Sequence, residues 1–108
     1  MAKVKKAWFI GVDGERYRLP QFEGRDVSLR EMYPIIGNGC SIAQLVHLKN
    51  GVEMWCDEEG LLKSNIEENG EASALYKKAL NRPDLGPEWT TIVGNAIVID
   101  NTKAGNFF

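Results

Sequence analysis

The chain has little of what marks several common protein classes. Its 108 residues contain one histidine and two cysteines, and no apolar run approaches the ~20 residues of a membrane-spanning helix. A structural zinc site needs four ligands, usually in close pairs, and Cys40 and Cys56 do not supply them. The formal net charge of -2 argues against a concentrated positive surface for nucleic acid. The sequence thus predicts no metal site, no membrane association and no direct binding of duplex DNA.

Signals of catalysis are equally sparse. His47 is the one histidine, and no nucleophile motif such as G-x-S-x-G accompanies it. Glu58 and Glu59 could serve as acid and base, but adjacent side chains on a strand point in opposite directions and would not share one substrate. We therefore predict no catalytic residue, no cofactor and no enzymatic role.

The composition is that of an ordinary globular domain, with 44% hydrophobic and 26% charged residues. We expect a single domain over residues 1–100 and a C-terminal tail over 101–108, in which Phe107 and Phe108 need a partner to be ordered. The apolar stretch at 8–10 is too short for the core of a signal peptide, so the cytoplasm is the expected location.

Two stretches have the pattern of β-hairpins. Residues 7–19 are β-prone on both sides of Asp13-Gly14, a favoured turn dipeptide, and Pro20 ends the second strand. Residues 41–56 alternate polar and apolar side chains on both sides of a turn at 49–51.

The second hairpin also bears on the cysteines. If it is centred on Asn50, Cys56 lies opposite Gln44 rather than Cys40. A disulfide between the two cysteines would then have poor geometry, so we expect both to be free thiols.

Two helices are predicted from capping and periodicity. Ser28 and Glu31 have the spacing of a capping box, which predicts a short helix near 28–33 that is either brief or broken at Pro34. An apolar stripe of helical period predicts the main helix at 71–81, with Asn69 as its N-cap. The stripe consists of Ala72, Leu75, Tyr76, Ala79 and Leu80.

Residues 90–99 allow two interpretations. They form either one long strand with a bulge at Gly94-Asn95 or a tight hairpin about the same two residues. Their nearly continuous apolar character favours one central strand that is covered on both faces.

Together these elements predict an α+β fold, a mostly antiparallel sheet of four to five strands with the main helix packed on one face. The other face would then expose Trp55, Leu45 and Phe9, which is too apolar for open water. We therefore expect a homodimer that uses sheet-face or edge-strand contacts including Trp55.

Six short motifs follow one another along residues 26–100. They are Ser28-Leu-Arg-Glu-Met, Gly37-x-Gly39, Ile42-x-x-Leu-Val46, Trp55-x-Asp-Glu-Glu-Gly-Leu61, Asn69-x-x-Ala72 and Ile92-Val-Gly-Asn-Ala-Ile-Val98. In this order and spacing they resemble a bacteriophage and plasmid family known as domain of unknown function 3846. The resemblance implies an accessory protein of a mobile element that acts in a bacterial cytoplasm, and it carries over no catalytic residue.

The candidate binding residues have structural as well as functional interpretations. Glu58 and Glu59 belong to an acidic turn that could bind a hard cation or simply face solvent. Gly37 and Gly39 could cradle a phosphate, but their turn precedes a strand rather than a helix.

Two asparagines and the tryptophans complete the candidate set. Asn69 and Asn95 could contact a ligand, although a helix cap and a bulge explain them equally well. Three tryptophans exceed what so small a core readily hides, which makes Trp55 a candidate for a binding surface.

These features support two hypotheses of function. The first is a non-enzymatic binding protein of a bacteriophage or mobile element that modulates a host protein, with counter-defence as one form of that role. The alternative is a small-molecule binder that sequesters a nucleotide signal, since indoles stack on bases and glycine-rich turns with lysine or arginine hold phosphate.

Overall fold

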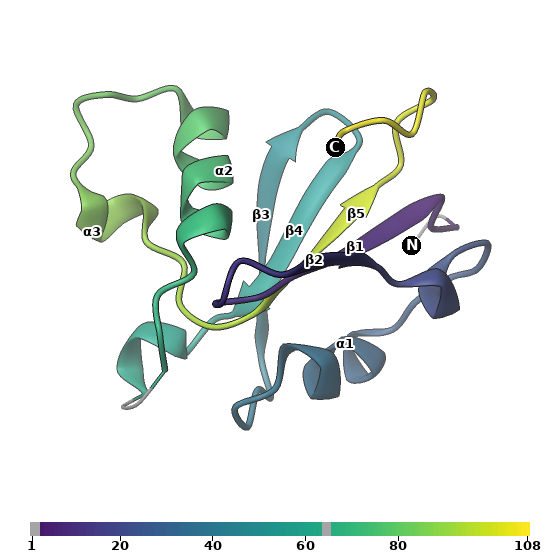
Figure 1. The fold of residues 1–108 in the computed structure, drawn as a ribbon, viewed down its shortest axis with the longest axis horizontal. Coiled ribbons are helices and arrows are strands. Elements are labelled where there is room, and N and C mark those ends of the chain that lie inside the picture. The colour runs from purple at the N-terminus through teal and green to yellow at the C-terminus, as the bar shows by residue number, and fades with distance from the viewer. Residues whose placement is uncertain (1–2, 64–65) are drawn as a thin grey trace.

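The computed structural model describes residues 3–63 and 66–108, which form a five-stranded antiparallel sheet with helices (Figure 1). The strand order is β2-β1-β5-β4-β3. The strands are β1 (Lys6–Ile10), β2 (Arg16–Arg18), β3 (Ala43–Lys49), β4 (Val52–Asp57) and β5 (Ala96–Asp100). The helices are α1 (Leu29–Ile36), α2 (Gly70–Leu80) and α3 (Pro87–Thr90), with short 3-10 turns η1 (Pro20–Phe22) and η2 (Gly60–Leu62). The predicted α+β class, the strand number and the main helix are confirmed.

Helices cover both faces of the sheet, as α1 and α2 lie on opposite sides of it in Figure 1. On the α2 face, even-numbered side chains such as Met54 and Val98 pack in one cluster with Ala72. On the α1 face, Ile97 and Phe9 pack in a second cluster. Alternation along each strand sends successive apolar residues to the two clusters.

The prediction of an uncovered second face is wrong for most of that face. Phe9 is only 8% exposed, because η1 and α1 bring Phe22 and Met32 into the same cluster. The part over β3 and β4 is less well covered, since Leu45 is 37% exposed and Trp55 is half-buried. The surface left open is therefore a strip at one edge of the sheet, not a whole face.

Both predicted hairpins are present. Glu15 accepts a main-chain hydrogen bond from Gly11 across the first turn, where Gly14 has a φ of +88° that favours glycine. In the second hairpin Gln44 lies directly opposite Cys56, as predicted. Cys40 and Cys56 are both free and buried.

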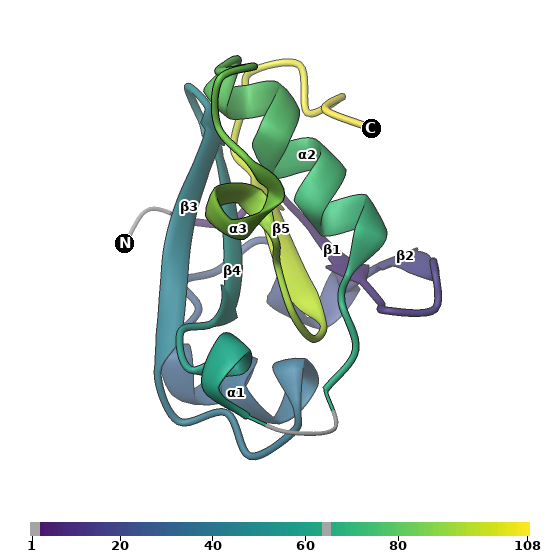
Figure 2. The same ribbon diagram turned by 90° about the vertical axis from the view of Figure 1, so that its left-hand side faces the viewer.

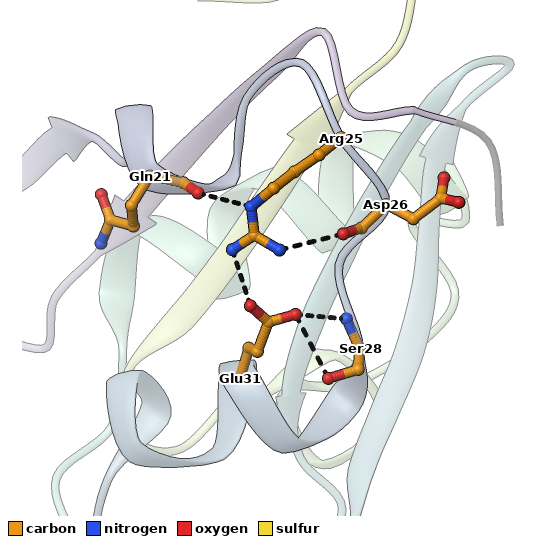
Figure 3. A network of polar contacts seen from close by, with 5 residues as sticks. All are labelled: Gln21, Arg25, Asp26, Ser28 and Glu31. Atoms are coloured by element: carbon orange, nitrogen blue, oxygen red, sulfur yellow. Dashed lines mark hydrogen bonds and ion pairs between the residues drawn. The ribbon is translucent and has the colours of Figure 1, made fainter.

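Helix α1 begins at its predicted cap, and Figure 3 shows the polar network that fixes it. The Glu31 carboxylate accepts from the Ser28 backbone N–H at 2.9 Å, and it pairs with Arg25 at 2.6 Å. Arg25 also donates to the backbone carbonyls of Gln21 and Asp26. The network joins the segment after η1 to the first turn of α1, which holds both over the sheet.

The prediction that this helix is brief or broken at Pro34 is wrong, because α1 continues through Pro34 to Ile36. Proline has no backbone N–H, so α1 has one hydrogen bond fewer at Pro34. Pro34 is exposed, so its ring takes no space from the core. Met32 and Ile36 lie about one turn apart and are 0% and 1% exposed. Their burial against the sheet outweighs the lost bond.

Both interpretations of residues 90–99 are wrong in their first half. Helix α3 occupies Pro87–Thr90, and the chain crosses beside α2, where Ile92 N–H donates to the Ser73 hydroxyl at 2.7 Å. Gly94 then turns the chain with a φ of +84° into β5. All five residues of β5 are buried, so the expectation of a central strand covered on both faces is confirmed for this shorter segment.

Residues 101–108 fold back along the α2 face. The Phe108 ring contacts the Trp8 ring edge-on, with centroids 5.3 Å apart, and Phe107 packs against Phe108. The contacts that order the two phenylalanines thus come from the same chain. Across the described ranges 3–63 and 66–108, no helix combines the length and apolar character needed to cross a membrane.

Candidate binding surface at one end of the sheet

The structure brings several of the predicted site residues to one end of the sheet, where α1 and η2 lie near the start of β5 (Figure 2). Lys63 joins two of the turns there. Its Nζ lies 2.6 Å from Asp57 Oδ2, after β4, and donates to the Asn38 carbonyl at 3.2 Å, between Gly37 and Gly39. Turns that are far apart in the sequence therefore form one surface.

Asp57 is the residue that organises this surface. Only 6% of it is exposed, and its Oδ1 accepts from the Glu59 backbone N–H at 2.9 Å. The hydrogen bond that Lys63 donates to the Asp57 carboxylate holds the pKa of Lys63 above its usual value, against the opposing effect of burial. The acidic turn is thus held by an internal ion pair. Among the described residues, no three or more His, Cys, Asp or Glu side chains are arranged so that they could hold a metal ion.

Glu58 and Glu59 lie on the outside of this turn. Glu58 is exposed, with its backbone N–H bonded to the Ile42 carbonyl, and Glu59 is half-buried. Leu61 and Leu62, which follow after Gly60, are 66% and 86% exposed. The sequence analysis placed Leu61 in a family motif but counted neither leucine among the candidate binding residues. The signal for exposure was that both follow a turn and belong to no periodic apolar stripe.

The turn containing Gly37 and Gly39 has positive φ angles at three successive residues. They are 74°, 55° and 71° for Gly37, Asn38 and Gly39. The Cys40 backbone N–H already donates to the Gly37 carbonyl, and Lys63, which reaches the turn, is paired with Asp57. These contacts favour a structural turn over a phosphate cradle.

The side chains of Asn69 and Asn95 form hydrogen bonds between segments that are distant in the sequence. The Asn69 side chain accepts from the Ala72 N–H at 3.0 Å, which confirms it as the cap of α2. Its amide nitrogen also donates to the carbonyls of Ile10 and Gly94. Asn95 joins Val12 and Ile36 in the same way, by accepting from the first and donating to the second.

The three tryptophans have different environments. Trp8 packs beneath Phe108, with Arg18 over its ring at 5.4 Å. Trp55 is half-buried opposite Leu45, and its Nε1 is buried without a hydrogen-bond partner in the described part of the chain. Trp89 on α3 is 65% exposed. The tryptophans therefore do not form one common surface.

A separate cavity of about 390 Å³ lies between α2, the end of β3 and the C-terminal segment. It combines aromatic and cationic side chains, and no predicted site residue lines it. Its lining residues are Leu48, Lys49, Leu75, Lys78, Ala79, Phe107 and Phe108. Sequence reasoning overlooked this combination because its members come from three separate segments.

Comparison of the chain with protein-family models, with curated proteins and with solved structures found no match in any of the three. The resemblance to domain of unknown function 3846 therefore stays a prediction. A function can be proposed only from the contacts and the exposure of the chain's own residues.

Proposed function

We propose that this protein is a non-enzymatic binding protein that docks on another protein through η2. The observation that carries the proposal is the exposure of Leu61 and Leu62, at 66% and 86%. Moving a leucine side chain from water into an apolar pocket is worth roughly 1.5–3 kcal/mol, so two adjacent ones form a strong anchor.

Hydrogen bonds within the chain hold the turn that presents these leucines. The Leu62 N–H donates to the Glu59 carbonyl at 2.9 Å, and the preceding turn is held by Asp57. Gly60 is buried so closely against the chain that a Cβ there would lie 3.0 Å from the Val93 carbonyl oxygen. A preorganised anchor loses little conformational entropy on binding.

The chemistry of the turn indicates the kind of partner. Glu58 and Glu59 stand beside the leucines, so the complementary surface is an apolar pocket with a basic rim. The resemblance to a family of mobile elements makes a host protein the expected partner, with modulation of that protein as the biological role.

The test starts from photocrosslinking in bacterial lysate, with a photoreactive residue at position 62 in one sample and at position 89 in another. A partner captured at position 62 is then purified, and its affinity is measured for the parent, for Leu61→Asp/Leu62→Asp and for the control Trp89→Asp. We expect the double variant to bind at least tenfold more weakly, with an unchanged melting temperature. Unchanged affinity of the double variant, or capture only at position 89, contradicts the proposal.

The cavity beside α2 favours a second candidate function, the binding of a nucleotide. Phe107 and Phe108 offer surfaces for a base, and Lys49 and Lys78 offer charges for phosphate. A panel of cyclic and linear nucleotides in a thermal-shift assay tests it, because ligand at 100 times its Kd adds about 2.7 kcal/mol of stability. Any shift should disappear in Lys49→Ala/Lys78→Ala, and the absence of a shift across the panel contradicts this function.

A further inference from the structure

The two edges of the sheet differ in how well they are protected against pairing with another strand. β2 is only three residues long and carries Arg16 and Arg18. β3 has seven residues, and the segment 41–48 contains no Lys, Arg, Asp or Glu. Short length, charged side chains and bulges are the usual protections of an edge. The one bulge of β3 lies between His47 and Lys49, so the segment 43–47 is an unprotected edge. Figure 2 shows β3 as the outermost strand of the sheet on that side.

The hydrogen bonds of the β3–β4 hairpin define which main-chain groups remain open. Glu58 N–H donates to the Ile42 carbonyl, and hydrogen-bonded pairs alternate along an antiparallel ladder. In this register the pairs Gln44–Cys56 and Val46–Met54 are therefore hydrogen-bonded. The main-chain groups of Ala43, Leu45 and His47 point the other way, toward the open edge.

We infer that the β3 edge pairs with the β3 edge of a second copy of this chain, antiparallel and centred on Leu45. The open groups of Leu45 then meet those of the partner's Leu45, and Ala43 meets the partner's His47. This arrangement is a closed two-fold contact in which each chain uses the same surface. It goes beyond the proposed function and does not depend on it.

The side chains in this register are self-complementary. Leu45 is 37% exposed and lies opposite Trp55 within its own chain. In the paired arrangement Trp55 and Leu45 of one chain, followed by the partner's Leu45 and the partner's Trp55, form one continuous apolar row. This row lies on the α1 face of the sheet, over the strip that is least covered. Within the paired segment 43–47 no like charges meet, since His47 lies opposite the partner's Ala43 and neither Lys, Arg, Asp nor Glu is present there. A partner of unrelated sequence would have to supply this pattern, whereas a second copy already has it.

Disulfide trapping tests the register directly. Leu45→Cys places two thiols on directly opposed residues, whose Cα atoms are about 5.5 Å apart, within the range of a disulfide. His47→Cys is the matched control, because its two copies are offset by about 13 Å along the strands. Cys40 and Cys56 are buried and stay in both variants.

We expect Leu45→Cys to give a covalent dimer at least tenfold faster than His47→Cys under mild oxidation. A mixture of Ala43→Cys and His47→Cys should crosslink between the two variants. Light scattering should report a dimer for the parent chain and a monomer with the parent's circular dichroism for Leu45→Lys. A monomeric parent at high micromolar concentration, or equal crosslinking at positions 45 and 47, overturns the inference.

Discussion

Replacing Asn69 with alanine is expected to lower the free energy of unfolding by about 3–5 kcal/mol, from the lost helix cap and the loss of buried hydrogen bonds. Asn69 is 0% exposed, and its side chain makes three hydrogen bonds that tie α2 to β1 and to the loop before β5. Alanine leaves the carbonyls of Ile10 and Gly94 without this donor in a region that excludes water. Urea denaturation followed by circular dichroism gives the change directly.

Two further variants separate the contributions of Asn69. Asn69→Asp keeps the oxygen that caps α2 but replaces the donor nitrogen with a second acceptor facing two carbonyls. It should therefore be about as destabilising as alanine, although the cap survives. Asn50→Ala removes an exposed asparagine and serves as the control. If Asn69→Asp is as stable as the parent chain, the bridging role assigned to its amide nitrogen is wrong.

Replacing Asp100 with asparagine is expected to cost about 2–4 kcal/mol and to loosen the C-terminal segment, because a buried acceptor is exchanged for a donor. Asp100 is 0% exposed, and its carboxylate accepts from the Thr102 N–H and hydroxyl and from the Phe107 N–H. An asparagine has one acceptor oxygen, so its NH₂ group must face at least one of these donors. Denaturation measures the stability, and hydrogen exchange of the Phe107 amide reports the release of the segment.

The same carboxylate predicts a dependence of stability on pH. Burial acts to raise the pKa of Asp100, but the hydrogen bonds from Thr102 and Phe107 outweigh it and hold this pKa below its usual value. A lowered pKa in the folded state gives stability that is present above about pH 4, the unfolded value, and is lost as the pH falls through the folded pKa. The free energy of unfolding should therefore decrease below about pH 4.

The control for this pH effect is Asp84→Asn. Asp84 also has a lowered pKa, caused by its hydrogen bond with Arg82, but its side chain is 61% exposed. Surface pairs of this kind contribute little, so Asp84→Asn should retain the acid dependence of the parent chain. Asp100→Asn should reduce it, and an equal acid dependence in the two variants would show that Asp100 is not its source.

The sequence by itself determined the features that depend on neighbours along the chain. Ser28 and Glu31 defined the start of α1, Asn69 defined the start of α2, and alternation about Asn50 put Gln44 opposite Cys56. Each of these needs only a turn of helix or the two arms of one hairpin, and the strict periods of helix and strand make such patterns readable. They were enough to predict the α+β class.

Only the tertiary structure decided which surfaces are covered and which contacts cross the chain. Pro34 stays inside α1 because the sheet buries Met32 and Ile36, and the acidic turn becomes ordered because Lys63 reaches both Asp57 and Asn38. The exposure of Leu62 likewise depends on what packs around η2. Such features arise from contacts between residues that are distant in sequence. The periodicity of apolar residues predicts local helices and strands, but it does not predict which distant residue packs at a given position.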